Sequence, residues 1–174
     1  MACPYFFPKE KCLTVAWAFP SRLPLGAGFC GTCRAPTPAW AKSAQSGGPG
    51  AAGEGAEATP DDAALRDFCN VGYARGCSRM PVERRADSVR FAVTADKGER
   101  VILSYVYDRD HLPVAHGQLE YDCIRQRWLS AVADACLERQ AECYLAIYLE
   151  KHPRPRGSDH PITGSPDHRI PSRR

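Results

Sequence analysis

Residues 89–121, VRFAVTADKGERVILSYVYDRDHLPVAHGQLEY, decide the fold. Apolar and polar side chains alternate along three runs in this stretch, which is the period of a strand with one buried face. Two turns separate the runs, one at residues 96–98 (Asp-Lys-Gly) and one at residues 108–113. The stretch therefore predicts a three-stranded antiparallel meander.

The residues that follow predict one long helix, or two helices with a break between them, packed across this meander. From Asp122 to Glu150, apolar side chains recur every three or four residues, as they do in an amphipathic helix. Cys136 and Cys143 lie within this apolar stripe, and Cys123 lies at the junction between strand and helix. Because free cysteine is among the most buried residue types, we expect these three thiols to have a structural role.

A shorter helix is predicted before the meander. The run Thr59–Asp62 combines an N-cap residue, a first-turn proline and two acids, which mark a helix start. Leu65, Phe68 and Cys69 follow at helical spacing. Gly72 then suits the helix end, so Cys69 is expected on the apolar face of a short helix.

Composition divides the 174-residue chain into four parts. Residues 1–39 form a cysteine-rich segment in which prolines and glycines interrupt the aromatic residues, so we expect an irregular fold there. Residues 40–59 are rich in Gly and Ala and predict a flexible linker or loop. Residues 60–150 carry the helices and the meander and are expected to form one domain with residues 1–39. Residues 151–174 are proline-rich and polar and predict a disordered tail. The fold class expected is α+β.

Charge and hydropathy narrow the expected partners. The whole chain carries a net charge of +3 and the tail carries +4, so the basic character belongs to the tail. Six basic residues scattered without aromatic neighbours argue against nucleic acid binding. No apolar run approaches the roughly 20 residues that cross a bilayer, and the first residues lack the pattern of a secretory signal. We therefore expect a cytoplasmic protein with reduced thiols, no membrane association and a protein partner.

The chain has nine cysteines, and their arrangement indicates a bound cofactor. The cysteines of the first half are Cys3, Cys12, Cys30, Cys33, Cys69 and Cys77. Such a dense set, bracketed by Gly and Pro, favours thiolates that converge on a metal or an iron–sulfur cluster. A bound cofactor would also supply the organisation that residues 1–39 lack, because its binding free energy becomes folding free energy.

The spacing ranks the candidate ligands. Cys69 and Cys77 are the strongest pair, since a helix end followed by a glycine-containing turn can aim both sulfurs inward. Cys3, with the proline that follows it, is the best fourth ligand. Cys33 is the third ligand, with Cys30 as its substitute, and Cys12 is the weakest candidate. The preferred set is Cys3, Cys33, Cys69 and Cys77.

Iron–sulfur and zinc make different demands on this set. Structural zinc commonly uses two short knuckles, and only Cys30 to Cys33 has that spacing. Cubane clusters accept scattered cysteines, so a four-Cys iron–sulfur cluster, a 4Fe–4S centre, is favoured over zinc. Its role would be electron transfer, redox sensing or structural. The alternative is a zinc-stabilised protein-interaction module without redox chemistry, and ordinary reduced thiols in a loop-rich domain remain a third interpretation.

Catalytic motifs are scarce, and an enzyme is not favoured. The chain has no nucleophile elbow, phosphate-binding glycine loop or HExxH motif. Cys30-Gly31-Thr32-Cys33 allows a dithiol enzyme, but the prolines at 36 and 38 argue against the helix that such a motif opens. Asp108, Asp110, His111 and His116 gather around one predicted turn, where such residues are common without any catalytic role.

Overall fold

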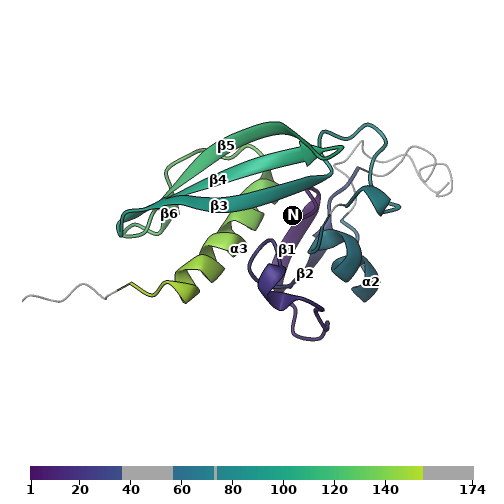
Figure 1. Cartoon of the computed structure of the whole chain (residues 1–174), viewed down its shortest axis with the longest axis horizontal. Coiled ribbons are helices and arrows are strands. Elements are labelled where there is room, and N and C mark those ends of the chain that lie inside the picture. The colour runs from purple at the N-terminus through teal and green to yellow at the C-terminus, as the bar shows by residue number, and fades with distance from the viewer. Residues whose placement is uncertain (37–56, 73, 155–174) are drawn as a thin grey trace, which may run out of the picture.

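The computed structural model describes residues 1–36, 57–72 and 74–154. They form a mixed α+β fold, the class that the sequence predicted, and the structure contains two antiparallel sheets. Figure 1 shows the larger sheet lying over helix α3, with the smaller sheet and a short helix beside them. The strands are β1 (Phe6–Lys11), β2 (Phe29–Cys33), β3 (Ser88–Asp96), β4 (Arg100–Arg109), β5 (Leu112–Asp122) and β6 (Arg127–Trp128). The helical segments are η1 (Pro20–Arg22), α2 (Asp62–Ala64), η2 (Leu65–Cys69), η3 (Ala74–Gly76) and α3 (Ala135–Lys151).

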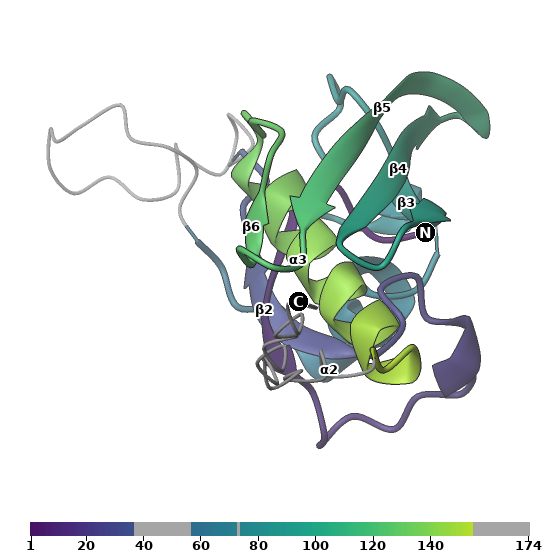
Figure 2. The same ribbon diagram turned by 90° about the vertical axis from the view of Figure 1, so that its left-hand side faces the viewer.

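The larger sheet has four strands in the order β3-β4-β5-β6, where the sequence predicted three. Leu103 and Leu119 are register partners on β4 and β5. Both are buried and pack against Ala141 of α3, which fixes the face of the sheet that the helix covers. Gly98 closes the first turn with a positive φ of 78°, a conformation that favours glycine. The face of the sheet that carries Leu103 and Leu119 therefore packs against α3. Figure 2 shows the sheet and α3 from a second direction.

Helix α3 begins at Ala135, so the predicted start at Asp122 is wrong. The Asp122 side chain accepts hydrogen bonds from the backbone N–H groups of Ile124 and Arg125, at 3.0 and 2.9 Å, which forms a turn instead. Strand β6 follows that turn. Asp134 is the N-cap of α3 and accepts from the backbone N–H of Cys136 at 2.9 Å. A side chain that caps a turn competes with helix formation. The spacing of apolar residues does not reveal this competition, so the predicted helix start was too early.

The sequence predicted an irregular amino-terminal segment, and this is wrong for part of it, because β1 and β2 pair there. Phe6 is the register partner of Cys33, and a bulge follows Pro8. The proline and the bulge break the alternation along β1, which explains why the sequence did not indicate a strand. Gly31 lies opposite Pro8, where an added Cβ would meet the backbone of β1.

The predicted linker and tail fall mostly outside the described residues. Of residues 40–59, the structure describes only 57–59, and Ala58 forms an isolated bridge with Cys33. Of residues 151–174, it describes 151–154. Lys151 ends α3, and Arg154 pairs with Asp96 at 3.0 Å.

Two buried amides connect the helical segments to the smaller sheet. Asn70 is 1% exposed, accepts from the backbone N–H of Phe29 at 2.8 Å and donates to the carbonyls of Phe29 and Leu65. Gln140 of α3 is fully buried and donates to the carbonyls of Cys3 and Phe6 at 2.8 and 2.6 Å. The segments around β1 and β2 are therefore held by side-chain to backbone hydrogen bonds as well as by apolar packing.

No helix among the described residues is both long and apolar enough to span a membrane.

Replacing Asn70 with Ala should lower the free energy of unfolding by about 3 kcal/mol, because it leaves the buried backbone N–H of Phe29 without the Asn70 acceptor and removes a side-chain donor from the carbonyls of Phe29 and Leu65. Urea denaturation measures this loss. The exposed change Gln118→Ala on β5 is the control and should cost less than about 0.5 kcal/mol. Equal effects of the two substitutions would contradict the role given to Asn70.

Candidate cofactor site

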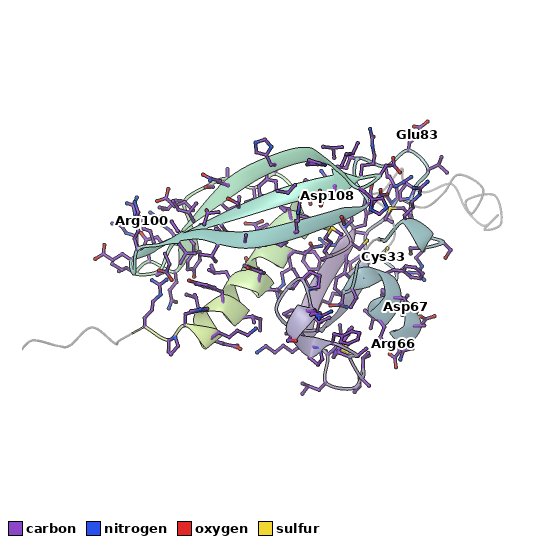
Figure 3. All side chains as sticks on the ribbon, in the orientation of Figure 1. Cys33, Arg66, Asp67, Glu83, Arg100 and Asp108 are labelled. Atoms are coloured by element: carbon purple, nitrogen blue, oxygen red, sulfur yellow. A yellow bond between two sulfur atoms is a disulfide. The ribbon has the colours of Figure 1, made fainter. Side chains whose placement is uncertain are left out.

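Four cysteines line one cavity beneath the end of the four-stranded sheet. They are Cys3, Cys33, Cys69 and Cys77, the set preferred from the sequence. The cavity has a volume of about 300 Å³, and its walls include Phe6 and Phe68. Figure 3 labels Cys33 at this position, between the smaller sheet and the short helix.

Each of the four thiols comes from a different segment. Cys3 precedes β1, Cys33 ends β2, Cys69 ends η2, and Cys77 follows η3. Backbone hydrogen bonds hold these segments in place. The N–H of Cys3 donates to the carbonyl of Cys69 at 3.1 Å, and the N–H of Cys33 donates to the carbonyl of Ala58 at 2.7 Å.

The helical turn before Cys69 departs from α-helical geometry. Helix α2 starts at Asp62, with Asp61 as N-cap accepting from the N–H of Ala64 at 2.8 Å. It continues directly into η2, a π-helical turn that ends at Cys69. Single π-helical turns are frequent at functional sites, because they re-aim a side chain. Here the turn ends on a thiol that faces the cavity.

Burial disfavours the thiolate forms of Cys3 and Cys69. Burial, with smaller contributions from Cys33 and Cys77, raises the pKa of Cys69 to about 12. Burial likewise raises the pKa of Cys3 well above its ordinary value, while a hydrogen bond from the Tyr5 backbone acts in the opposite direction.

Cys30, the substitute ligand, does not join this cavity. It forms a disulfide with Cys12, with Cα atoms 4.8 Å apart. The expectation that all thiols are reduced is therefore wrong for this pair. Cys30 and Cys33 are three residues apart on β2, and side chains at that spacing point to opposite faces of a strand. The pairing of Cys30 with Cys12 also argues against a Cys30–Cys33 dithiol enzyme.

The four cysteines border one cavity, but they are not grouped as a preformed metal site. Within residues 1–36, 57–72 and 74–154, no three His, Cys, Asp or Glu side chains are grouped so that they could hold a metal ion. The thiols nevertheless border the same cavity.

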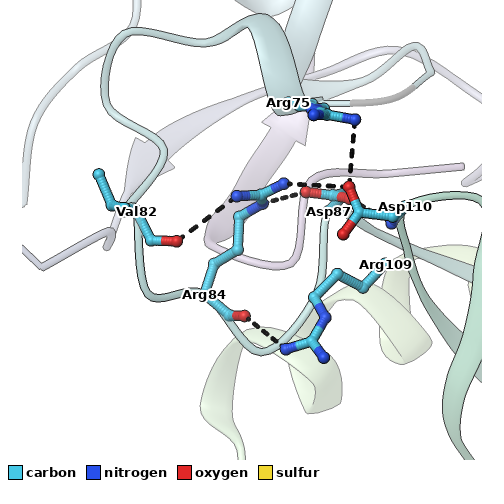
Figure 4. A network of polar contacts seen from close by, with 6 residues as sticks. All are labelled: Arg75, Val82, Arg84, Asp87, Arg109 and Asp110. Atoms are coloured by element: carbon cyan, nitrogen blue, oxygen red, sulfur yellow. Dashed lines mark hydrogen bonds and ion pairs between the residues drawn. The ribbon is translucent and has the colours of Figure 1, made fainter.

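A polar network holds the loop that carries Cys77 (Figure 4). Asp87 is fully buried, pairs with Arg84 and accepts from the backbone N–H of Asp110 at 2.8 Å. Asp110 also pairs with Arg75, at 3.1 Å. The loop is thereby tied at both ends to the turn between β4 and β5.

Further contacts of Arg84 and its neighbours complete the network of Figure 4. Arg109 donates to the carbonyl of Arg84 at 3.4 Å, and Arg84 donates to the carbonyl of Val82 at 3.5 Å. These arginines act within the fold as donors to carboxylates and carbonyls. The sequence did not indicate the pairings of Arg75 with Asp110 and of Arg109 with Arg84, because these partners are distant in the chain.

The remaining sequence candidates have structural positions. Asp110 and His111 adopt positive φ angles of 50° and 66° in the turn after β4, and Asp108 pairs with Arg90. Cys136 and Cys143 are buried free thiols on α3. The partly exposed thiol of Cys123 is also free.

Sequence reasoning missed other residues of the cavity wall. Asp61, Ser78 and Arg79 line the cavity beside the thiols, and all three are exposed. The positive charge of Arg79 lowers the pKa of Cys69, against the larger effect of burial. The proximity of Ser78 and Arg79 to Cys77 in the chain was the available signal.

No known protein family, curated protein or solved structure matches this chain.

The metal-free protein should become less stable as the pH rises from about 8 to about 10.5. The folded state holds the Cys69 proton up to a pKa of about 12, whereas the unfolded chain releases it near the ordinary value of 9.0. The unfolded state therefore binds fewer protons in this range, and folding stability falls. Anaerobic urea denaturation with a chelator measures the midpoint. Cys69→Ala should reduce the fall of the urea midpoint with pH. A midpoint of the native protein that is constant or rises with pH would contradict the role given to the Cys69 thiol.

Proposed function

We propose that this protein binds an iron–sulfur cluster, 4Fe–4S in type, on Cys3, Cys33, Cys69 and Cys77, and uses it in electron transfer or redox sensing. The observation that carries this proposal is the convergence of four thiols, from four separate segments, on one cavity. The four cysteines lie far apart in the sequence, so their convergence on one cavity is unexpected for ordinary core cysteines. The donor set fits the cofactor, because clusters of this type are ligated by four thiolates.

The size of the cavity favours a cluster over a single ion. Four thiolates around zinc at about 2.3 Å would have sulfurs about 3.8 Å from one another, which leaves no cavity between them. The observed cavity has a volume of about 300 Å³ and is bordered by all four cysteines. This space suits a compact inorganic core of several atoms.

The chain also supplies the surroundings that such a cluster requires. Phe6 and Phe68 line the cavity and would limit water access. The backbone of Tyr5 hydrogen-bonds to the Cys3 sulfur, and Arg79 places a positive charge near Cys69. Hydrogen bonds to sulfur and local charge are the means by which proteins set cluster potentials. When bound, the cluster would supply one-electron chemistry.

The position of the cavity supports exchange of electrons with a protein partner. Its wall includes the exposed residues Asp61, Ser78 and Arg79, so the cavity lies next to solvent. A partner that docks over these residues would approach the cluster without rearrangement of the core. A cytoplasmic location, where such partners and free thiols are common, remains a prediction from the sequence.

A zinc-stabilised interaction module is the second candidate, favoured by the four-thiolate donor set alone. Zinc binding would require the four segments to close around one ion. Anaerobically purified protein separates the two candidates. Iron with acid-labile sulfide and visible absorption supports the cluster, whereas a colourless protein with one zinc per chain supports the module.

Cys69→Ser and Cys77→Ser should each reduce bound iron and sulfide by about tenfold, because each removes one of the four thiolates. Metal and sulfide analysis with visible absorption measures the loss. Cys123→Ser is the matched control and should retain the full iron content, since the partly exposed Cys123 does not line the cavity. Equal iron content in all three variants would overturn the assignment of the ligands.

Circular dichroism of the same variants tests the structural contribution of the cofactor. Cys69→Ser and Cys77→Ser should lose thermal stability together with iron, whereas iron lost without any change in stability would show that the cofactor does not support the fold.

A further inference from the structure

We propose that a second cavity, separate from the cysteine site, binds a small anionic molecule with a flat apolar body. This cavity has a volume of about 470 Å³ and lies between residues 16–23 and the helical segment around η2. Trp17, Phe19 and Leu23 provide its apolar wall. Arg22, Arg66 and Asp67 provide its charged side chains.

The indole of Trp17 is fixed before any ligand arrives. Its N–H donates to the carbonyl of Cys12 at 3.4 Å. The ring also packs over Gly28, where an added Cβ would collide with it. A ring held in this way offers a flat apolar surface without the entropy cost of ordering it on binding.

The two arginines give the cavity its preference for an anion. Neither Arg22 nor Arg66 forms an ion pair with any carboxylate in the part of the chain that the structure describes. The Arg22 guanidinium lies 5.5 Å from the centre of the exposed Phe19 ring. Asp67 contributes the opposite charge, so the three charged groups sum to one positive charge.

These features together define the ligand class. Guanidinium groups bind carboxylate and phosphate oxygens in paired hydrogen bonds, and aromatic rings stack on flat apolar groups. The volume lies within the range of about 300–1,000 Å³ that small-molecule sites occupy. An aromatic or similarly flat compound that carries a carboxylate or phosphate fits both the apolar wall and the arginines of the cavity.

The second cavity lies on the other side of the helical segment that supplies Cys69. Ala64, Phe68 and Cys69 line the cysteine cavity, whereas Arg66 and Asp67 line the second one. Figure 3 shows Arg66 and Asp67 on the side of this segment away from Cys33. Ligand binding here does not require the proposed cluster, so the two proposals can fail separately.

Isothermal titration of the full chain with four compounds tests the ligand class. The compounds are 2-naphthyl phosphate, 2-naphthoate, 2-naphthol and inorganic phosphate. At least one naphthyl anion should bind at least about tenfold more tightly than both 2-naphthol and inorganic phosphate, because only the naphthyl anions use both the apolar wall and the arginines of the cavity. Comparison of the two naphthyl anions distinguishes a phosphate from a carboxylate ligand. Equal binding of neutral 2-naphthol would overturn the proposal, as would no binding of either anion.

Three variants and one control locate the binding. Arg22→Gln and Arg66→Gln should each weaken binding of the preferred anion by about tenfold, since each removes a charged donor. Asp67→Asn should strengthen it, since it removes a negative charge from the wall. The control Arg127→Gln changes an exposed arginine beside Trp128 on β6 and should leave binding unchanged.

The Trp17 indole resonance, identified through Trp17→Phe, should shift on titration of the native protein. Binding that persists in both Arg22→Gln and Arg66→Gln, or a Trp17 resonance that does not move, would overturn the proposed site. Circular dichroism of each variant establishes that it is folded.

Discussion

The structure depends on the backbone hydrogen bonds of residues 1–3, which lie between the larger sheet and the segment that ends in Cys69. On one side, Ala2 exchanges hydrogen bonds of 2.7 and 2.8 Å with Val89 of β3. On the other side, Cys3 donates to the carbonyl of Cys69, and Gly72 donates to the carbonyl of Met1 at 2.9 Å. Ala2 is fully buried. These contacts join the sheet to the helical segment and place two of the four cavity thiols side by side.

The remaining thiols follow from this arrangement. β1 continues from Cys3 and pairs with β2, which brings Cys33 to the cavity, while Asn70 fixes the helical segment against Phe29. Asp87 and its arginine partner hold the loop of Cys77 near the start of β3. The contacts that position the four cysteines come from several segments of the chain, so the cavity is formed by the fold as a whole.

Local patterns in the sequence predicted part of the fold and of the cysteine cavity. The alternation along residues 89–121 predicts strands whose apolar side faces a helix, and the α+β class is confirmed. The preferred cysteines were chosen for Gly and Pro neighbours and a helix end, and they line one cavity. β1 and β2 were missed because Pro8 interrupts the alternation, and the start of α3 was misplaced because Asp122 caps a turn. The Cys12–Cys30 pairing and the Trp17 cavity arise from residues brought together only by folding, which spacing along the chain does not reveal.

Anomalous X-ray diffraction at the iron and zinc absorption edges, on crystals of anaerobically purified protein, tests the central claim most directly. We expect a compact peak of several iron atoms within bonding distance of the sulfurs of Cys3, Cys33, Cys69 and Cys77. A single zinc peak among these sulfurs, or four sulfurs with no metal between them in protein that was never exposed to oxygen or chelator, would contradict the assignment of an iron–sulfur centre.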